Sequence, residues 1–279
     1  MARWLIDMAG VKITVRAKTG PAKHIAKLAL SAMHTERVSS SQGIKLSLKF
    51  NDEQWELVDH TSQLRRKLAQ PGDVIYHLTD RIVFHIADKA QKVHCLHAAA
   101  VSKGGNAIVV PANSGAGKST LTTWLTANGF EYITDELILV DSDGRLEGVA
   151  RPIQIKFHGL DVISRLLVTP ELVQKGKFVT ALPIDSLGGV VNSGDTLLGA
   201  FVFPKYKKGA EFSFNALSSA DAGMRLMANH VNARNLEGHG FSAMMSLIRN
   251  TPCYSLEYGG FDTLPSDFSS QLEALLNNA

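Results

Sequence analysis

A glycine-rich stretch at residues 111–120 most constrains what this 279-residue chain can fold into. Its letters are PANSGAGKST, with an apolar run at residues 107–110 before it and an amphipathic segment at residues 119–128 after it. These flanks predict a buried strand, a tight loop and a helix, the order that a phosphate-binding loop requires. The usual spacing is G-x-x-x-x-G-K-[ST], and here Ala112 replaces the first glycine. The stretch predicts a site for the phosphates of a nucleoside triphosphate.

Each part of this loop has a predicted role. Backbone N–H groups can surround a phosphate, while Gly115 and Gly117 allow positive φ and close backbone approach. Lys118 is predicted to reach the β- and γ-phosphates, and the Ser119 hydroxyl to bind Mg²⁺. The alternative is an ordinary Gly/Ser-rich turn, which both flanks disfavour. The predicted nucleotide-binding residues are Asn113, Ser114, Gly115, Ala116, Gly117, Lys118, Ser119 and Thr120.

Two adjacent carboxylates, Asp135 and Glu136, follow the predicted helix at residues 121–127 and a predicted strand at residues 130–133. One carboxylate can orient or deprotonate an attacking hydroxyl while the other holds Mg²⁺. A solvated acidic turn is the alternative. The apolar run at residues 137–140 favours a functional pair, because an unpaired charge inside a sheet layer is costly. The predicted metal ligands are Ser119, Asp135 and Glu136.

A hairpin is predicted from residues 93–101 through a turn at residues 103–106 into the strand before the loop. His94 and His97 are three residues apart, which places them on opposite faces of a strand and argues against a shared metal site. Taken alone, His97 is more often a hydrogen-bonded core histidine than a catalytic one.

From His97 through the loop to Asp135 and Glu136, residue types and spacing resemble the HPr kinase/phosphorylase superfamily, and more closely its branch called HPr-kinase-related kinase A. Later segments also resemble that branch, at residues 151–156, 202–206 with 209–210, 229–232 before 238–241, and 252–258. The resemblance covers about residues 71–279.

This resemblance implies an ATP-dependent kinase in which Asp135 deprotonates or orients a serine hydroxyl, with His97 near Asp135 and Lys118 as a further catalytic residue. It also implies a peptide or protein acceptor, association with a peptide-modification partner, and allows a homo-oligomer. Glu136 replaces the second aspartate of the family's acidic pair. A small-molecule kinase and a non-catalytic ATP-sensing module are the two alternative functions.

One departure from the family concerns its glutamate-isoleucine-arginine-glycine signature, whose counterpart here is residues 154–157. Gln154 lacks the carboxylate, which argues against a second metal and against phosphorolysis. Lys156, Arg151 and Arg234 are candidate phosphate or substrate contacts, although Lys156 fits a surface lysine on an edge strand equally well.

Composition limits the function classes. A formal net charge of +3 without a long basic run gives no indication of nucleic-acid binding. No apolar run is long enough to cross a membrane and no signal peptide is evident, so we expect a cytoplasmic protein without a membrane partner. The two cysteines, Cys95 and Cys253, do not suggest a disulfide framework.

The predicted fold class is α/β (α+β), with an HPr-kinase-like catalytic domain at residues 71–279 built on a mainly β sheet and a small α+β module at residues 1–70. In the module, alternating residues predict strands at 11–16 and 44–50, a helix at 24–33 and a third strand at 54–58. A helix is predicted at residues 74–89, capped by Asp73. Its expected apolar face is Ile75, Leu78, Ile82, Phe84, Ile86 and Ala90.

Overall fold

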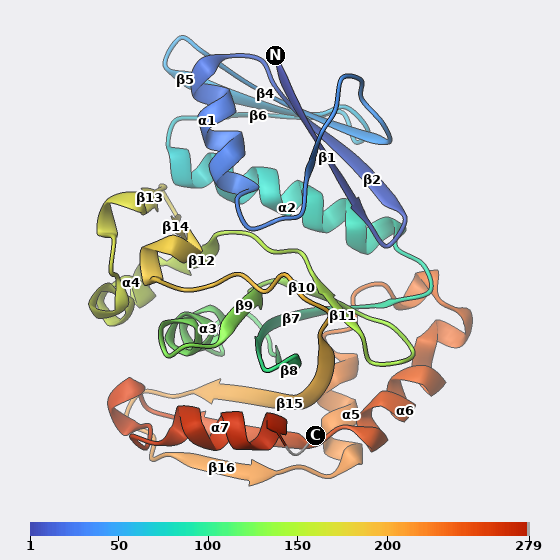
Figure 1. Ribbon diagram of the computed structural model, residues 1–279, viewed down its shortest axis with the longest axis vertical. Coiled ribbons are helices and arrows are strands. Elements are labelled where there is room, and N and C mark those ends of the chain that lie inside the picture. Colours follow the sequence, from blue (N-terminus) through green and yellow to red (C-terminus); the bar gives the residue numbers. More distant parts are fainter. Residues whose placement is uncertain (278–279) are drawn as a thin grey trace. The chain divides into compact units, whose positions relative to one another are not determined.

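The computed structural model describes residues 1–277, except for the side chains of residues 157 and 158. It divides into two compact units, drawn in Figure 1. The first comprises Met1–Ala90 and Ala150–Gly188, and the second comprises Gln91–Val149 and the chain from Gly189 onward. Both combine helices and sheets, which confirms the mixed α+β class. The boundary predicted at residues 70 and 71 falls inside the first unit.

The first unit carries most of the N-terminal half of the chain. Its strands are β1 (Ala2–Met8), β2 (Val11–Ala17), β3 (Glu36–Arg37), β4 (Ile44–Asn51), β5 (Gln54–Asp59), β6 (Leu64–Leu68), β12 (Ile153–Lys156), β13 (Gln174–Lys175) and β14 (Val179–Leu182). Its helices are α1 (Gly20–Ala29), α2 (Pro71–Lys89), α4 (Phe157–Ile163) and the short 3₁₀ turns η1 (Ser164–Leu166), η2 (Pro170–Leu172) and η3 (Ile184–Leu187).

Strands β1 to β6 form one sheet in the order β3-β1-β2-β4-β5-β6, and β12 to β14 form a second in the order β12-β14-β13. The predicted strands at residues 11–16, 44–50 and 54–58 are confirmed. The sequence argument missed β1, which pairs with β2 across a turn where Ala9 and Gly10 have φ of 48° and 76°. Helices α1 and α2 pack on each other and on strands of the larger sheet.

The helix predicted at residues 24–33 begins earlier than expected, at Gly20, and ends at Ala29. Pro21 lies in its first turn, where its fixed φ suits a helix and its missing N–H costs nothing. The prediction followed the apolar residues and overlooked this start signal.

Helix α2 corrects two details of the prediction. It begins at Pro71 with Gln70 as N-cap, so Asp73 does not cap it. The Asp73 carboxylate instead accepts hydrogen bonds from the Lys177 backbone N–H at 3.0 and 2.9 Å. Phe84 was expected on the buried face but is 46% exposed. The buried stripe contains His85 in its place, because a buried carboxylate supplies a partner for the imidazole.

That carboxylate belongs to Asp59, the last residue of β5, and its side chain is fully buried. It lies 2.7 Å from His85 Nε2 and 3.1 Å from Arg81 Nε, and it accepts from the Ser62 backbone N–H at 3.1 Å. Burial alone would raise the pKa of Asp59, but hydrogen bonds from Ser62 and His85 outweigh it, so its pKa lies below its usual range. The ionised form therefore stabilises the folded unit above about pH 4, and this contribution is lost as pH falls.

We expect Asp59→Ala to lower the free energy of unfolding by about 3–5 kcal/mol at neutral pH, because Arg81 and His85 lose their buried partner. The difference from wild type should shrink as pH falls below about 4. Urea unfolding at several pH values measures both effects. Asp7→Asn is the control, since Asp7 and Lys12 form a half-exposed pair at 3.6 Å and its loss should cost no more than about 1 kcal/mol. Equal losses in the two variants would contradict the assignment.

The second unit carries the predicted phosphate loop. Its strands are β7 (His94–Lys103), β8 (Asn106–Pro111), β9 (Glu131–Thr134), β10 (Leu137–Val140), β11 (Leu146–Gly148), β15 (Leu197–Tyr206), β16 (Ser213–Ala216) and β17 (Cys253–Tyr258). Its helices are α3 (Lys118–Ala127), α5 (Ser219–Met227), α6 (Phe241–Asn250), α7 (Phe268–Asn277) and the 3₁₀ turns η4 (Ala233–Asn235), η5 (Glu237–Gly240) and η6 (Phe261–Thr263).

These strands form one sheet in the order β11-β10-β7-β8-β15-β17-β16, with β9 also paired to β7. Strands β8, β15 and β17 run parallel, and β7 forms the predicted antiparallel hairpin with β8. Successive side chains of a strand point to opposite faces. Ala107 and Val109 accordingly join the cluster with α5 and α6, while Ile108 and Val110 join the cluster with α3 and α7. Burial on both faces explains the continuous apolar run before the loop.

Two further strand predictions for this unit are confirmed. The strands predicted at residues 130–133 and 137–140 correspond to β9 and β10, and residues 141–144 form the turn between β10 and β11. Helix α3 is followed by Asn128 and by Gly129, whose φ is 85°. Within residues 1–277, none of the helices has the length and apolar character needed to cross a membrane.

Candidate functional site

The candidate site begins at the loop between β8 and α3. The strand is buried on both faces, and the helix starts at Lys118 with Gly117 as its N-cap in the left-handed region. No side chain caps this end of the helix, so backbone N–H groups of its first turn are directed toward the loop. A helix start of this kind favours an anion, because the N–H groups of a first helical turn and the helix dipole both act on negative charge.

Both loop glycines have the backbone conformation that the sequence predicts, with φ of 91° at Gly115 and 94° at Gly117. Gly117 also has no room for a side chain. A Cβ at this position would lie 2.6 Å from the Tyr258 hydroxyl and 3.1 Å from the Tyr206 Cβ, whereas a Cβ at Gly115 would meet nothing within 4 Å. Gly115 is therefore required for its backbone conformation alone, whereas Gly117 is required both for its conformation and for the lack of space.

The ends of two parallel strands hold this loop. Tyr206, the last residue of β15, donates its backbone N–H to the Ala116 carbonyl at 3.2 Å. Tyr258, the last residue of β17, donates its hydroxyl to the Gly117 carbonyl at 3.5 Å. Burial raises the pKa of Tyr258, and Tyr206 raises it further, so the hydroxyl keeps its proton at neutral pH. Within the loop, the Ala116 N–H donates to the Asn113 carbonyl at 3.2 Å.

Lys118 and Ser119 occupy the first turn of α3. The Lys118 side chain is buried and folds back so that its ammonium group donates to the Ala112 carbonyl at the start of the loop. The Ser119 hydroxyl donates to Asp135 Oδ2 at 3.3 Å. This contact joins residues 16 positions apart, because β9 returns beside the loop.

Asp135 is 1% exposed and lies between β9 and β10. Its other carboxylate oxygen accepts from the Tyr132 hydroxyl at 3.4 Å. The Thr134 hydroxyl organises this turn, because it accepts from the Glu136 N–H at 3.2 Å and donates to the Val149 carbonyl at 2.9 Å. The carboxylate of Asp135 is therefore presented to the loop by a fixed turn.

Glu136 and His97 form the second contact of the site. Strand β10 pairs with β7 in the register that places Leu137 opposite His97. His97 Nε2 consequently lies 3.6 Å from Glu136 Oε1, with the two side chains 31% and 32% exposed. The acidic pair is thus divided between one buried carboxylate next to Ser119 and one partly exposed carboxylate next to His97.

The remaining predicted contacts are distributed over both units. Arg151 is buried in the first unit, and Arg234 lies in η4 of the second. Lys156 is exposed at the end of β12, an edge strand of the smaller sheet in the first unit. The structure brings Lys118, Ser119 and Asp135 together in the second unit and leaves the roles of Arg151, Lys156 and Arg234 as predictions.

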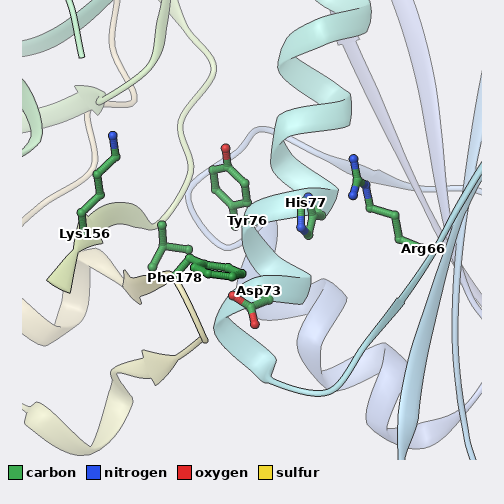
Figure 2. Close-up of a pocket in the computed structure, with 7 residues that line it drawn as sticks. Arg66, Asp73, Tyr76, His77, Lys156 and Phe178 are labelled. Carbon is green, nitrogen blue, oxygen red and sulfur yellow. The ribbon is translucent and has the colours of Figure 1, made fainter. Parts of the chain in front are cut away.

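Lys156 lines a pocket of about 570 Å³ within the first unit. Figure 2 shows Lys156 and Arg66 at opposite ends of this pocket, with Phe178, Asp73 and His77 between them. Burial lowers the pKa of His77, and Arg66 lowers it further. The pocket therefore presents cationic side chains at its two ends and an exposed aromatic ring in the middle.

A histidine pair lies on the other face of β7, with His94 buried and His230 partly buried. His94 Nδ1 is 3.4 Å from His230 Nε2, and burial together with His230 lowers the pKa of His94 to about 4. Both rings are therefore neutral at physiological pH. His94 and His97 have different partners, and no group of three or more His, Cys, Asp or Glu side chains that could hold a metal occurs in the described part of the chain.

Sequence reasoning missed Tyr132, Tyr206 and Tyr258 as residues of this site. Their positions carried one usable signal: Tyr206 follows the apolar run at residues 200–203, which becomes part of a strand parallel to β8. The parallel pairing itself is not visible in the sequence, so the signal could not be interpreted alone.

Comparisons with protein-family models and with curated proteins gave no match for this chain.

We expect Gly115→Ala to cost about 1–2 kcal/mol of stability, because alanine must adopt a positive φ. Gly117→Ala should cost about 1–3 kcal/mol more, since the new Cβ also displaces the Tyr258 hydroxyl. Adding Tyr258→Phe to Gly117→Ala should recover part of that extra loss by removing the oxygen. Chemical unfolding of the four proteins measures the differences. Equal costs at the two glycines would show that the contact with Tyr258 is unimportant.

Proposed function

We propose that the protein is an ATP-dependent kinase that transfers the γ-phosphoryl group to a hydroxyl, with serine of a peptide or protein as the acceptor. The observation that carries the proposal is the 3.3 Å contact between Ser119, in the first turn after the phosphate loop, and the buried Asp135. The contact supports the proposal, because a hydroxyl that could bind a metal and a carboxylate that could act as a base then lie together beside the loop. As part of the same proposal, the catalytic core has an HPr-kinase-like fold.

Binding of the phosphates is assigned to the loop and to Lys118. Backbone N–H groups at the start of α3 and the loop amides surround the phosphates, and the Lys118 ammonium neutralises charge on the β- and γ-phosphates. Lys118 is buried against the loop, which favours a role in the loop over that of a solvated surface lysine. Its donor bond to Ala112 is replaced by phosphate oxygens when nucleotide binds.

The donor set around Ser119 fits Mg²⁺. Magnesium prefers oxygen ligands, and in nucleotide sites it uses one or two carboxylates, a hydroxyl and the phosphates. The Ser119 hydroxyl and the Asp135 carboxylate are in contact, and Glu136 is the next residue along the chain. Ser119 and Glu136 would hold the ion, with Asp135 beside it; when bound, the ion would neutralise phosphate charge and orient the β- and γ-phosphates.

Asp135 is the proposed base. The acceptor oxygen forms a bond to the γ-phosphorus while the bond from that phosphorus to the β–γ bridging oxygen breaks, and ADP leaves. The hydroxyl proton passes to the Asp135 carboxylate. A loose transition state requires mainly positioning and charge neutralisation from the protein, so one carboxylate with a fixed orientation is sufficient. Tyr132 and the Thr134 turn supply that orientation.

His97 and Glu136 have the more exposed position. Their contact at 3.6 Å suits a pair that faces the acceptor side, where His97 orients Glu136. The choice of a peptide or protein serine rests on the resemblance to the kinase branch stated above. The replacement of the family's glutamate by Gln154 supports transfer without the phosphorolytic reverse reaction.

We expect Lys118→Ala to reduce MgATP affinity by at least tenfold, because a charge-assisted contact to phosphate is lost. Calorimetric titration with MgATP measures the affinity. Lys103→Ala is the matched control, because Lys103 lies at the opposite end of the β7–β8 hairpin and donates to the Gly129 carbonyl. Unchanged MgATP affinity in Lys118→Ala would refute the phosphate-loop assignment.

We expect Asp135→Asn to keep ATP affinity and to lose phosphoryl transfer by about two to four orders of magnitude, because the base is removed. The assay follows label from γ-labelled ATP with Mg²⁺ into fractions of a lysate of the protein's own host. Asp143→Asn, in the exposed turn after β10, is the control and should retain transfer. Label on one peptide or protein supports the proposal. Label only in a metabolite indicates a small-molecule kinase, and tight ATP binding without transfer indicates a nucleotide sensor.

A further inference from the structure

The carboxyl ends of β8, β15 and β17 lie at one edge of the sheet, because these three strands run parallel. Open sheets with parallel strands bind ligands outside these carboxyl ends. The phosphate loop follows β8 at this edge, Tyr206 ends β15, and Tyr258 ends β17. The loop and the two tyrosines therefore belong to one candidate binding edge.

The order of the strands places different residues on the two sides of the loop at this edge. On one side of β8 lies β7, which carries His97. Strand β10 pairs with β7, so the turn with Asp135 and Glu136 lies on this side as well. On the other side lie β15 and β17 with their tyrosines. In the proposed function the γ-phosphate faces Asp135. The nucleoside of a triphosphate bound along the loop must then extend toward β15.

Tyr206 has the properties of a platform for a planar ring. Its side chain is 43% exposed, whereas that of Tyr258 is 1% exposed. The two rings meet edge to face with centroids 5.7 Å apart, so the buried Tyr258 supports the exposed Tyr206. The Tyr206 backbone N–H donates a hydrogen bond to the Ala116 carbonyl of the loop. This bond fixes the position of the ring relative to the loop that is proposed to hold the phosphates.

Charges around Tyr206 suit the same ligand. Lys205 is paired with Glu257 at 2.9 Å, while Lys207 and Lys208 follow Tyr206 as exposed side chains. The Lys207 backbone is anchored, because its N–H donates to the Tyr258 carbonyl at 3.1 Å. The exposed ring is thus bordered by cations on a fixed backbone, which favours an anionic ligand with an aromatic part.

We propose that the ring of Tyr206 stacks on the base of the nucleotide and so forms the base subsite of this protein. The inference rests on the proposed function, because it takes the γ-phosphate to lie beside Asp135. Stacking tolerates different bases, since every base has a π face. Base recognition is therefore assigned to ring stacking at the end of β15.

The test compares two ligands that share the phosphates but not the base, MgATP and magnesium tripolyphosphate, by calorimetric titration. Tyr206→Ala should weaken MgATP binding between about fivefold and 100-fold, the range for loss of one base–aromatic stack, and should leave tripolyphosphate binding unchanged. Tyr206→Phe keeps the ring and should retain most of the MgATP affinity. Tyr206→Leu keeps apolar bulk against Gly117 but should behave like Tyr206→Ala.

Two outcomes would overturn the base subsite while leaving phosphate binding intact. Unchanged MgATP affinity in Tyr206→Ala would show that the base lies elsewhere. Equal weakening of MgATP and tripolyphosphate would show that Tyr206 only supports the loop. Failure of the wild-type protein to bind either ligand would instead refute the proposed function and this inference together. Met224→Ala, at a 71% exposed position on α5, is the control and should alter neither affinity.

Discussion

The close approach of the loop between β8 and α3 to the ends of β15 and β17 is the constraint on which the candidate site of the second unit depends. Gly117 has no space for a side chain because Tyr258 and Tyr206 lie against it, and both tyrosines also bond to loop carbonyls. The parallel sheet brings these strand ends together, and its burial on both faces keeps them in register. The local loop conformation and the long-range sheet therefore stabilise each other.

The same sheet divides the polar groups by environment. Asp135 is buried beside Ser119, whereas Glu136 and His97 are each about one-third exposed on the neighbouring strand pair. Two adjacent carboxylates thus differ in solvent access and in partner. The first unit uses a carboxylate in another way, since Asp59 is buried with Arg81 and His85 and has a structural role.

Much of the architecture could be predicted from local patterns. The alternating residues of β2, β4 and β5, the apolar run of β8 and the helix after the loop are all confirmed. The errors have specific physical causes. Helix α1 starts at Gly20 because Pro21 favours a first turn, and Phe84 is exposed because the buried position beside it holds His85 bonded to Asp59. Hydrophobic periodicity predicts buried positions from their apolar side chains. It cannot predict a buried polar side chain whose hydrogen-bond partner lies far away in the sequence.

The sequence by itself determined the strand, loop and helix, the positive φ of Gly115 and Gly117, and the placement of Lys118 and Ser119 in one helical turn. These features are set by interactions among neighbouring residues. Only the tertiary structure decided that Ser119 meets Asp135, that His97 meets Glu136, and that Tyr206 and Tyr258 border the loop. Those contacts depend on which strands pair and in which direction, and strand pairing joins segments whose separation along the chain carries no local signal.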